Sequence, residues 1–222
     1  MLHIDPSVKE KYPDLLFGVM VMEQVHNPEI NEELNVKKQA LEKNLRQQFE
    51  GYDRKALKAL QPIDKYNQFY KQFKKTYHVQ HQLESIVLKN KNLPNVAALV
   101  ESMFMSEVKN LLLTAGYDFS TVSENVNVKL ADGNASFEGI GNRSKTPPQN
   151  DILFTDSNSI LGSIICGPDH KSRITPQTTK ALFVIYGVPG ITYTQIKKHL
   201  EDIEMNVKVI APDSYVSHLS IL

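Results

Sequence analysis

Short apolar runs separated by polar turns dominate the stretch from Asp151 to Ile191. The runs cover residues 152–154, 160–166 and 181–186 and are rich in β-branched and aromatic side chains. Their length, and the Gly, Pro, Asp and Asn residues that bound them, are typical of buried strands. The polar segment GPDHKSRIT joins the second run to the third. Because polar loops on a strand scaffold often carry function, we expect a functional loop there.

Apolar residues at helical spacing predict helices in other parts of the chain. The expected helices cover residues 28–49, a segment that Pro62 opens, residues 95–113, and a segment that begins after Thr192. Thr192 and Gln195 have the spacing of a capping box. We expect residues 115–118 to end the third helix, with Gly116 supplying the turn.

The remaining strands are expected at residues 15–22, 125–130, 135–140, 207–210 and 215–222. Asp132-Gly133 indicates a hairpin that joins the second and third of these strands. The order is then strand, four helices, several strands, helix, strand. This order predicts an α+β fold with a mostly antiparallel sheet wrapped by helices, and we interpret residues 1–222 as one domain.

Composition excludes several classes of protein. The 222 residues are 41% hydrophobic, and 25 basic side chains balance 25 acidic ones, which argues against a general coat for nucleic acid or membrane. No apolar run approaches the ~18 residues of a membrane span, so we expect no membrane association. The single cysteine, Cys166, allows no internal disulfide. With no signal-peptide pattern at the N-terminus, we expect a cytoplasmic protein.

Residues 51–91 form the one locally basic segment, with nine Lys or Arg against three acids. Aromatic residues interleave with Lys71, Lys74 and Lys75, a pattern that suggests a phosphate-facing surface. The alternative is an ordinary amphipathic helix with its aromatics in the core and its lysines in water. His78 and His81 could share a helix face, but no further ligand follows at a suitable spacing, so we expect no metal and no cofactor.

No known catalytic motif is present, so candidate chemistry rests on single residues. Glu101 lies near the apolar stripe of the third expected helix. Asp169 and Arg173 lie in the polar loop, where the arginine either clamps the loop or receives a carboxylate or phosphate. Cys166 ends an apolar run, which favours a buried and inert thiol. We therefore name Asp169, Arg173 and Glu101 as the candidate catalytic residues.

Three segments, LPNVAALVESMFMSEVKNLLLTAGYD, NVNVKLADGNASFEGIG and DILFTDSNSILGSIICGPDHKSRITPQTTKALFVIYGVPGI, follow one another in the chain. In that order they resemble the tRNA-editing (B-three/B-four) domain of the phenylalanyl-tRNA synthetase beta subunit, and more closely its freestanding relatives. The resemblance implies an α+β fold and hydrolysis of a wrongly attached amino acid from tRNA.

The sequence departs from that family at the polar pocket positions. The family's pocket asparagine falls at Phe104, its histidine at Ala115, and its glutamate at Val184 or Ile185. Two other positions keep the family's residue types, namely Asp118 and Thr178. The resemblance therefore implies the scaffold, but most of the family's polar editing groups are replaced.

Together, the loop and the resemblance place substrate binding at Phe104, Gly167, His170, Thr175 and Thr178. Three functions stay open at this point: a freestanding deacylase acting on mischarged aminoacyl-tRNA, a noncatalytic tRNA or RNA binder, and a binder of an amino-acid-like small molecule. The sequence does not indicate the oligomeric state.

Overall fold

A central sheet of four strands organises the computed structural model, which describes residues 2–123 and 125–222. Its order is β11-β2-β10-β3, and every pair is antiparallel. The strands are β2 (Leu16–Glu23), β3 (Thr114–Asp118), β10 (Lys180–Gly187) and β11 (Tyr215–Ile221). β2 and β10 are buried along almost their whole length. Burial of both faces explains why these strands are continuous apolar runs in the sequence.

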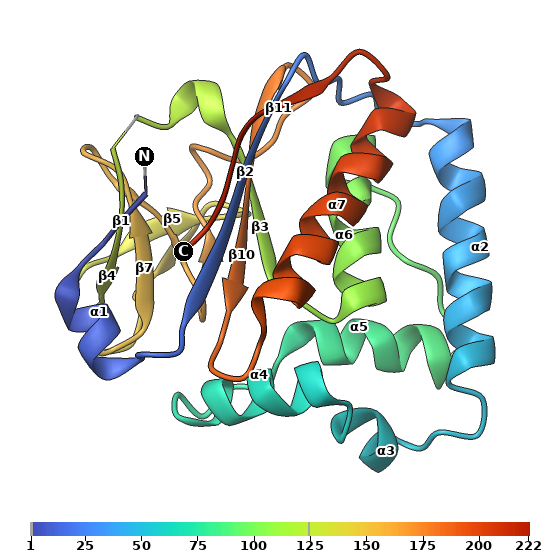
Figure 1. Ribbon diagram of the computed structural model, residues 1–222, viewed down its shortest axis with the longest axis horizontal. Helices are drawn as coiled ribbons and strands as arrows, with labels where there is room; N and C mark the ends of the chain where they lie inside the picture. The colour runs from blue at the N-terminus through green and yellow to red at the C-terminus, as the bar shows by residue number, and fades with distance from the viewer. Residues whose placement is uncertain (1, 124) are drawn as a thin grey trace.

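A second sheet lies against one face of the first (Figure 1). Its order is β1-β4-β7-β8-β9, with β1 and β4 parallel and the other pairs antiparallel. The strands are β1 (Leu2–Ile4), β4 (Val126–Leu130), β7 (Ile152–Thr155), β8 (Ile160–Ser163) and β9 (Gly167–Pro168). A separate ribbon pairs β5 (Phe137–Gly139) with β6 (Arg143–Lys145).

Helices cover the other face of the central sheet. α6 (Ala98–Asn110) and α7 (Tyr193–Ile210) pack side by side on the sheet, and α2 (Glu32–Gln48) forms an outer layer (Figure 1). α7 approaches the sheet closely at Gly187, where an added Cβ would lie 2.7 Å from Ile196 Cδ1. The shorter helices are α1 (Pro6–Lys11), α3 (Arg54–Lys58), α4 (Gln61–Lys71), α5 (His78–Val87) and the 3-10 turn η1 (Phe119–Thr121).

The predicted α+β class is confirmed, as are the predicted strands at residues 15–22, 152–154 and 181–186. The predicted capping box is also present: Gln195 N donates to Thr192 Oγ1 at 3.3 Å, and Thr192 N donates to Gln195 Oε1 at 2.8 Å. In the described part of the chain, no helix is both long and apolar enough to cross a membrane.

The predicted end of the helix at residues 115–118 is wrong. α6 ends at Asn110 because Leu111 adopts a left-handed conformation (φ 59°), and residues 114–118 form β3 instead. Gly116 is therefore a strand residue, and its missing side chain makes room for Ile174, whose Cδ1 would lie 2.8 Å from an added Cβ.

Two further predictions, the hairpin at Asp132-Gly133 and the strand at residues 207–210, are wrong. Asp132-Gly133 does not close a hairpin, because β4 pairs with β1 and β7, while β5 pairs with β6. Residues 207–210 form the last turn of α7 rather than a strand, and Val207 and Ile210 are buried on its inner side. The pattern Val-Lys-Val-Ile at residues 207–210 fits both a helix and a strand, so local pattern alone does not separate them.

Candidate functional site

A cavity of about 550 Å³ lies between α6, the start of α5, β3 and the loop that follows β8. Most of its wall is apolar, and the larger apolar side chains on it are Val100, Met103, Phe104, Leu113, Ile164 and Ile174. Ala115 and Gly116 of β3 also line it. We call this space the α6–β3 cavity.

Glu107 places a carboxyl group on the wall of this cavity. It belongs to α6, its side chain is almost fully buried at 1% exposure, and its Oε1 accepts a hydrogen bond from Thr114 N at 2.8 Å. No ion pair found among residues 2–123 and 125–222 includes Glu107. Burial without a cation disfavours the charged form and raises the pKa of Glu107 to about 8.

Other polar groups reach the cavity from two elements, namely α5 and the loop after β9. Gln82 of α5 contributes Oε1, a buried acceptor for which the described residues supply no donor. His78 is exposed at the beginning of the same helix. Arg173 enters from the loop after β9, and its Nη1 donates to the carbonyl of His170 at 2.7 Å.

Thr114 connects the cavity wall to a polar network behind it. Its hydroxyl lies 2.6 Å from Nε2 of His199, which is fully buried in α7. Burial lowers the pKa of His199 to about 3, so the imidazole is neutral at physiological pH. Asn110 bridges His199 Nδ1 at 3.2 Å and Asp202 Oδ2 at 2.8 Å. This network ties α6, α7 and β3 together and so holds one wall of the cavity rigid.

The structure does not bring the three candidate catalytic residues together. Glu101 is buried on the side of α6 that faces α2, where Lys38 Nζ lies 2.7 Å from Oε1, and it does not line the cavity. Asp169 is buried and accepts from Ser172, through the backbone N at 3.1 Å and through the hydroxyl. Of the three residues, the α6–β3 cavity is lined by Arg173 alone.

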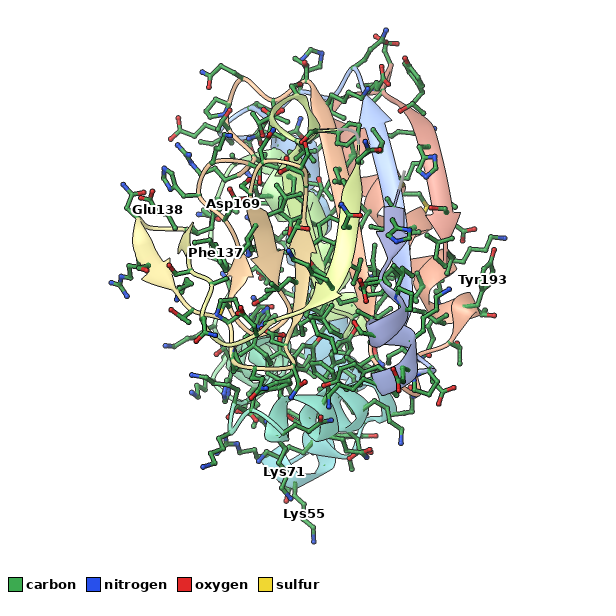
Figure 2. All side chains as sticks on the ribbon, turned by 90° about the vertical axis from the view of Figure 1, so that its left-hand side faces the viewer. Lys55, Lys71, Phe137, Glu138, Asp169 and Tyr193 are labelled. Carbon is green, nitrogen blue, oxygen red and sulfur yellow. The ribbon has the colours of Figure 1, made fainter. Side chains whose placement is uncertain are left out.

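Asp169 and Arg173 do not pair with each other either. Asp169 holds the backbone at Ser172, whereas Arg173 holds the carbonyl of His170. Both residues thus stabilise the loop, but through separate contacts. Asp169 faces a second hollow, of about 450 Å³, which Glu138, His170 and other residues also line. Figure 2 shows Asp169 beside Phe137 and Glu138.

The predicted substrate-binding residues also lie in separate places: two line the α6–β3 cavity, one lines the second hollow, and two line neither. Phe104 and Gly167 line the α6–β3 cavity, and His170 lines the second hollow. Thr175 and Thr178 instead close their own loop, since Thr175 N donates to Thr178 Oγ1 at 2.9 Å. Thr178 Oγ1 in turn donates to Asp118 Oδ2 at 2.8 Å.

Of the positions matched to the editing pocket, Phe104 and Ala115 lie on the cavity wall. Val184 is fully buried within β10 and is not among the lining residues. Phe104 and Ala115 are two of the residues that make the wall of the cavity apolar.

The predicted nucleic-acid surface is exposed. Lys71, Lys74 and Lys75 are all exposed, and Figure 2 shows Lys71 at the helical end of the molecule, away from Asp169. The interleaved aromatics, including Tyr66, Phe69, Tyr70 and Tyr77, are buried in the core, as expected for an amphipathic helix. RNA binding by these lysines stays a prediction.

Lys75 also lies near the loop that lines the cavity. Burial raises the pKa of the Cys166 thiol in this loop, and the positive charges of Lys145 and Lys75 act in the opposite direction. Two ammonium groups are therefore close to the segment that continues into Gly167 on the cavity wall. Among the described residues, no group of three or more His, Cys, Asp or Glu side chains is placed to hold a metal ion.

Glu107 and Gln82 are the site residues that sequence reasoning missed. A signal for Glu107 does exist, because it follows Phe104 by three residues and therefore shares the apolar stripe of the helix. An acid on an apolar stripe needs either a partner or a function. Gln82 has no comparable signal, since its position on the cavity depends on how α5 packs against α6.

The site thus belongs to an α+β protein with a mostly apolar cavity and a few buried acceptors. No protein-family model matches the chain, and no curated protein matches it. Among solved structures, it is similar to an N-terminal fragment of the phenylalanyl-tRNA synthetase beta subunit from Pyrococcus horikoshii, with a TM-score of 0.48 and 10% identity. The match covers 100% of this chain and 50% of that one, so the chain spans half the length of that fragment.

Proposed function

We propose that the protein binds a small, largely apolar molecule of amino-acid size in the α6–β3 cavity. The observation that carries the proposal is a space of about 550 Å³ with apolar walls and a few buried polar atoms. Ligand sites typically measure about 300–1,000 Å³ and have this composition. Packing voids in protein cores rarely exceed one water molecule, so the space is too large to be a packing defect.

The size of the cavity restricts the ligand. A cavity of about 150 Å³ is enough for benzene. The α6–β3 cavity therefore accommodates an aromatic or branched side chain together with the polar groups attached to it. Phe104 and Met103 offer an aromatic face and a polarisable thioether for such a side chain.

A thermal-shift screen with apolar amino acids, their amides and their amines tests this proposal. A compound at well above its dissociation constant raises the melting temperature, because it binds the folded state alone. Gly116→Ala narrows the cavity, and its Cβ meets the mobile end of Ile174, so the variant is expected to fold and to lose the shift. Gln177→Ala, at an exposed position outside the cavity, is the matched control. A flat response over the whole screen would contradict the proposal.

A second candidate is a deacylase that hydrolyses the ester of mischarged aminoacyl-tRNA in trans. Its support is the position of Phe104 and Ala115 on the cavity wall, and the positive charges of Lys75 and Lys145, which act to lower the pKa of Cys166 in the loop before Gly167. The aminoacyl group would enter the cavity while the lysines contact the tRNA backbone, and water would displace the ribose hydroxyl from the carbonyl carbon. Incubation with a panel of mischarged tRNAs should release one amino acid, more slowly for Gly116→Ala. No release from any tRNA at micromolar protein excludes this activity.

A third candidate is RNA binding without catalysis, through the exposed Lys71, Lys74 and Lys75. The combined change of Lys71, Lys74 and Lys75 to Ala is expected to weaken tRNA binding and to reduce the dependence of affinity on salt. Because all three side chains are exposed, the melting temperature should not change. Affinity that is insensitive to salt in the parent protein would contradict this function.

A further inference from the structure

The buried polar atoms of the α6–β3 cavity are mainly hydrogen-bond acceptors. Glu107 has one hydrogen bond, from Thr114 N to Oε1. Gln82 Oε1 is buried and receives no hydrogen bond from the described residues. Burying an acceptor without a donor costs about 1–3 kcal/mol, and a carboxylate costs more. Gln82 Oε1 has no donor among the described residues, and the Glu107 carboxyl group has only that of Thr114, so a ligand that brings donors complements both residues.

We propose that the cavity binds its ligand as a protonated primary amine, with Glu107 as the ion-pair partner and Gln82 as a second acceptor. The inference rests on the proposed small-molecule function and specifies the chemical class of the ligand: an ammonium head on an apolar body. An ammonium group supplies three donors and no acceptor, which complements the two acceptors. A cation close to a buried carboxyl group favours its charged form.

The surroundings of Glu107 offer no competing cation. The phenol groups near Glu107 are those of Tyr66 and Tyr70 in α4 and of Tyr77, the residue before α5. Burial raises the pKa of each phenol, and the charge of Glu107 makes a smaller contribution in the same direction. Behind Thr114 lies His199, which burial keeps neutral. Each of these groups is uncharged near neutral pH, so none of them satisfies a Glu107 carboxylate.

The other titratable groups on the cavity wall are His78, Tyr186 and Arg173. The Tyr186 hydroxyl lies 3.1 Å from that of Tyr117, and burial raises the pKa of both phenols. Arg173 is engaged with the carbonyl of His170 and comes from the loop opposite α6. The ammonium head of the ligand is therefore favoured at the Glu107 side of the cavity, away from the guanidinium group of Arg173.

Binding should be linked to the loss of a proton from Glu107. With a pKa of about 8, the carboxyl group is mostly protonated at pH 6.5 and must ionise when the cation binds. The affinity of an amine should therefore rise roughly twenty-fold between pH 6.5 and pH 8.5, below the pKa of the ligand itself. A neutral ligand of the same shape needs no ionisation and should show no such rise.

Titration calorimetry with three phenyl compounds of matched length tests the proposal: phenethylamine, 2-phenylethanol and 3-phenylpropionate. We expect the amine to bind at least ten-fold more tightly than the alcohol at pH 8.5, and the acid to bind least. At pH 6.5, repeating the amine titration in two buffers of different ionisation enthalpy should reveal the release of close to one proton. Glu107→Gln keeps the acceptor for Thr114 N and should abolish both the preference for the amine and its pH dependence.

Gln82→Met, which removes the acceptor but keeps the length of the side chain, should weaken the amine three- to ten-fold and leave the alcohol unchanged. The proposal is overturned if the alcohol or the acid binds as tightly as the amine, or if Glu107→Gln leaves the preference for the amine intact. If the alcohol binds and the amine is not preferred, the proposal of small-molecule binding is retained and that of a cationic ligand is refuted. If none of the three compounds binds, both proposals are refuted.

Discussion

Glu107 should make the protein less stable as the pH rises through neutrality, and Glu107→Gln should remove most of this effect. The pKa of the carboxyl group is about 8 in the folded protein, against an ordinary value of 4.5. Between these two values the folded state binds more protons than the unfolded state. The stability that the neutral carboxyl provides is therefore complete below about pH 4.5 and is lost as the pH rises towards 8.

The size of the effect follows from the two pKa values. One pKa unit corresponds to about 1.4 kcal/mol, so the separation corresponds to on the order of 5 kcal/mol between acidic and alkaline pH. This is comparable with the whole free energy of unfolding of a typical domain, about 5–15 kcal/mol. Glutamine has the same shape, accepts the same hydrogen bond from Thr114 N and does not titrate.

Urea unfolding of both proteins, followed by circular dichroism at pH 5, 6, 7, 8 and 9, measures the effect. The difference in free energy of unfolding should shift by several kcal/mol in favour of Glu107→Gln from pH 5 to pH 9. Asp151, whose pKa burial raises to about 6, titrates in both proteins and cancels in this difference. Glu201→Gln, at an exposed position, should follow the parent at every pH. If the curves of the parent and Glu107→Gln are parallel, then Glu107 is not the buried acid that its contacts indicate.

Three further outcomes test other parts of the structure. Lys38→Met should lower the free energy of unfolding by about 3–5 kcal/mol, because it leaves the buried Glu101 without its cation. The double variant Lys38→Met/Glu101→Leu should recover most of this loss. A double variant as unstable as the single one would contradict the pairing. Thr178→Val should cost about 1–3 kcal/mol, because Asp118 loses a buried donor; an unchanged urea midpoint would show that water replaces the hydroxyl. Cys166 should react with a thiol reagent at pH 7.5 more slowly than glutathione does, because burial raises the pKa of its thiol, and an equal rate would contradict this environment.

The elements that the sequence predicts well are those whose own pattern decides their structure. β2 and β10 are continuous apolar runs because both of their faces are covered, and the Thr192 capping box marks the start of α7 by purely local hydrogen bonds. The predictions that fail depend on distant partners. Leu111, rather than a glycine, adopts the left-handed conformation that ends α6, and the residues after it are drawn into β3 by pairing with β10.

The same distinction applies to the candidate site. Arg173 and Gly167 could be predicted because a polar loop between strands is recognisable in the sequence, and Phe104 could be predicted from the resemblance. The position of Glu101 away from the cavity could not be predicted, because its partner Lys38 lies on another helix and no local pattern indicates that ion pair. Glu107 differs from Glu101 in having no such partner among the described residues, a contrast that only the packed structure reveals.

The pairing of β2 has a consequence for how the chain reaches its folded state. Glu23 pairs with Lys180 on one side and with Tyr215 on the other, so both neighbours of an early strand are made late in synthesis. Until they emerge from the ribosome, an apolar strand has two open edges, while α2 to α6 can form from local contacts. Because the formation of distant contacts slows folding, we expect the central sheet to be completed only after β10 and β11 have been translated, and β2 to be the segment most in need of chaperone protection until then.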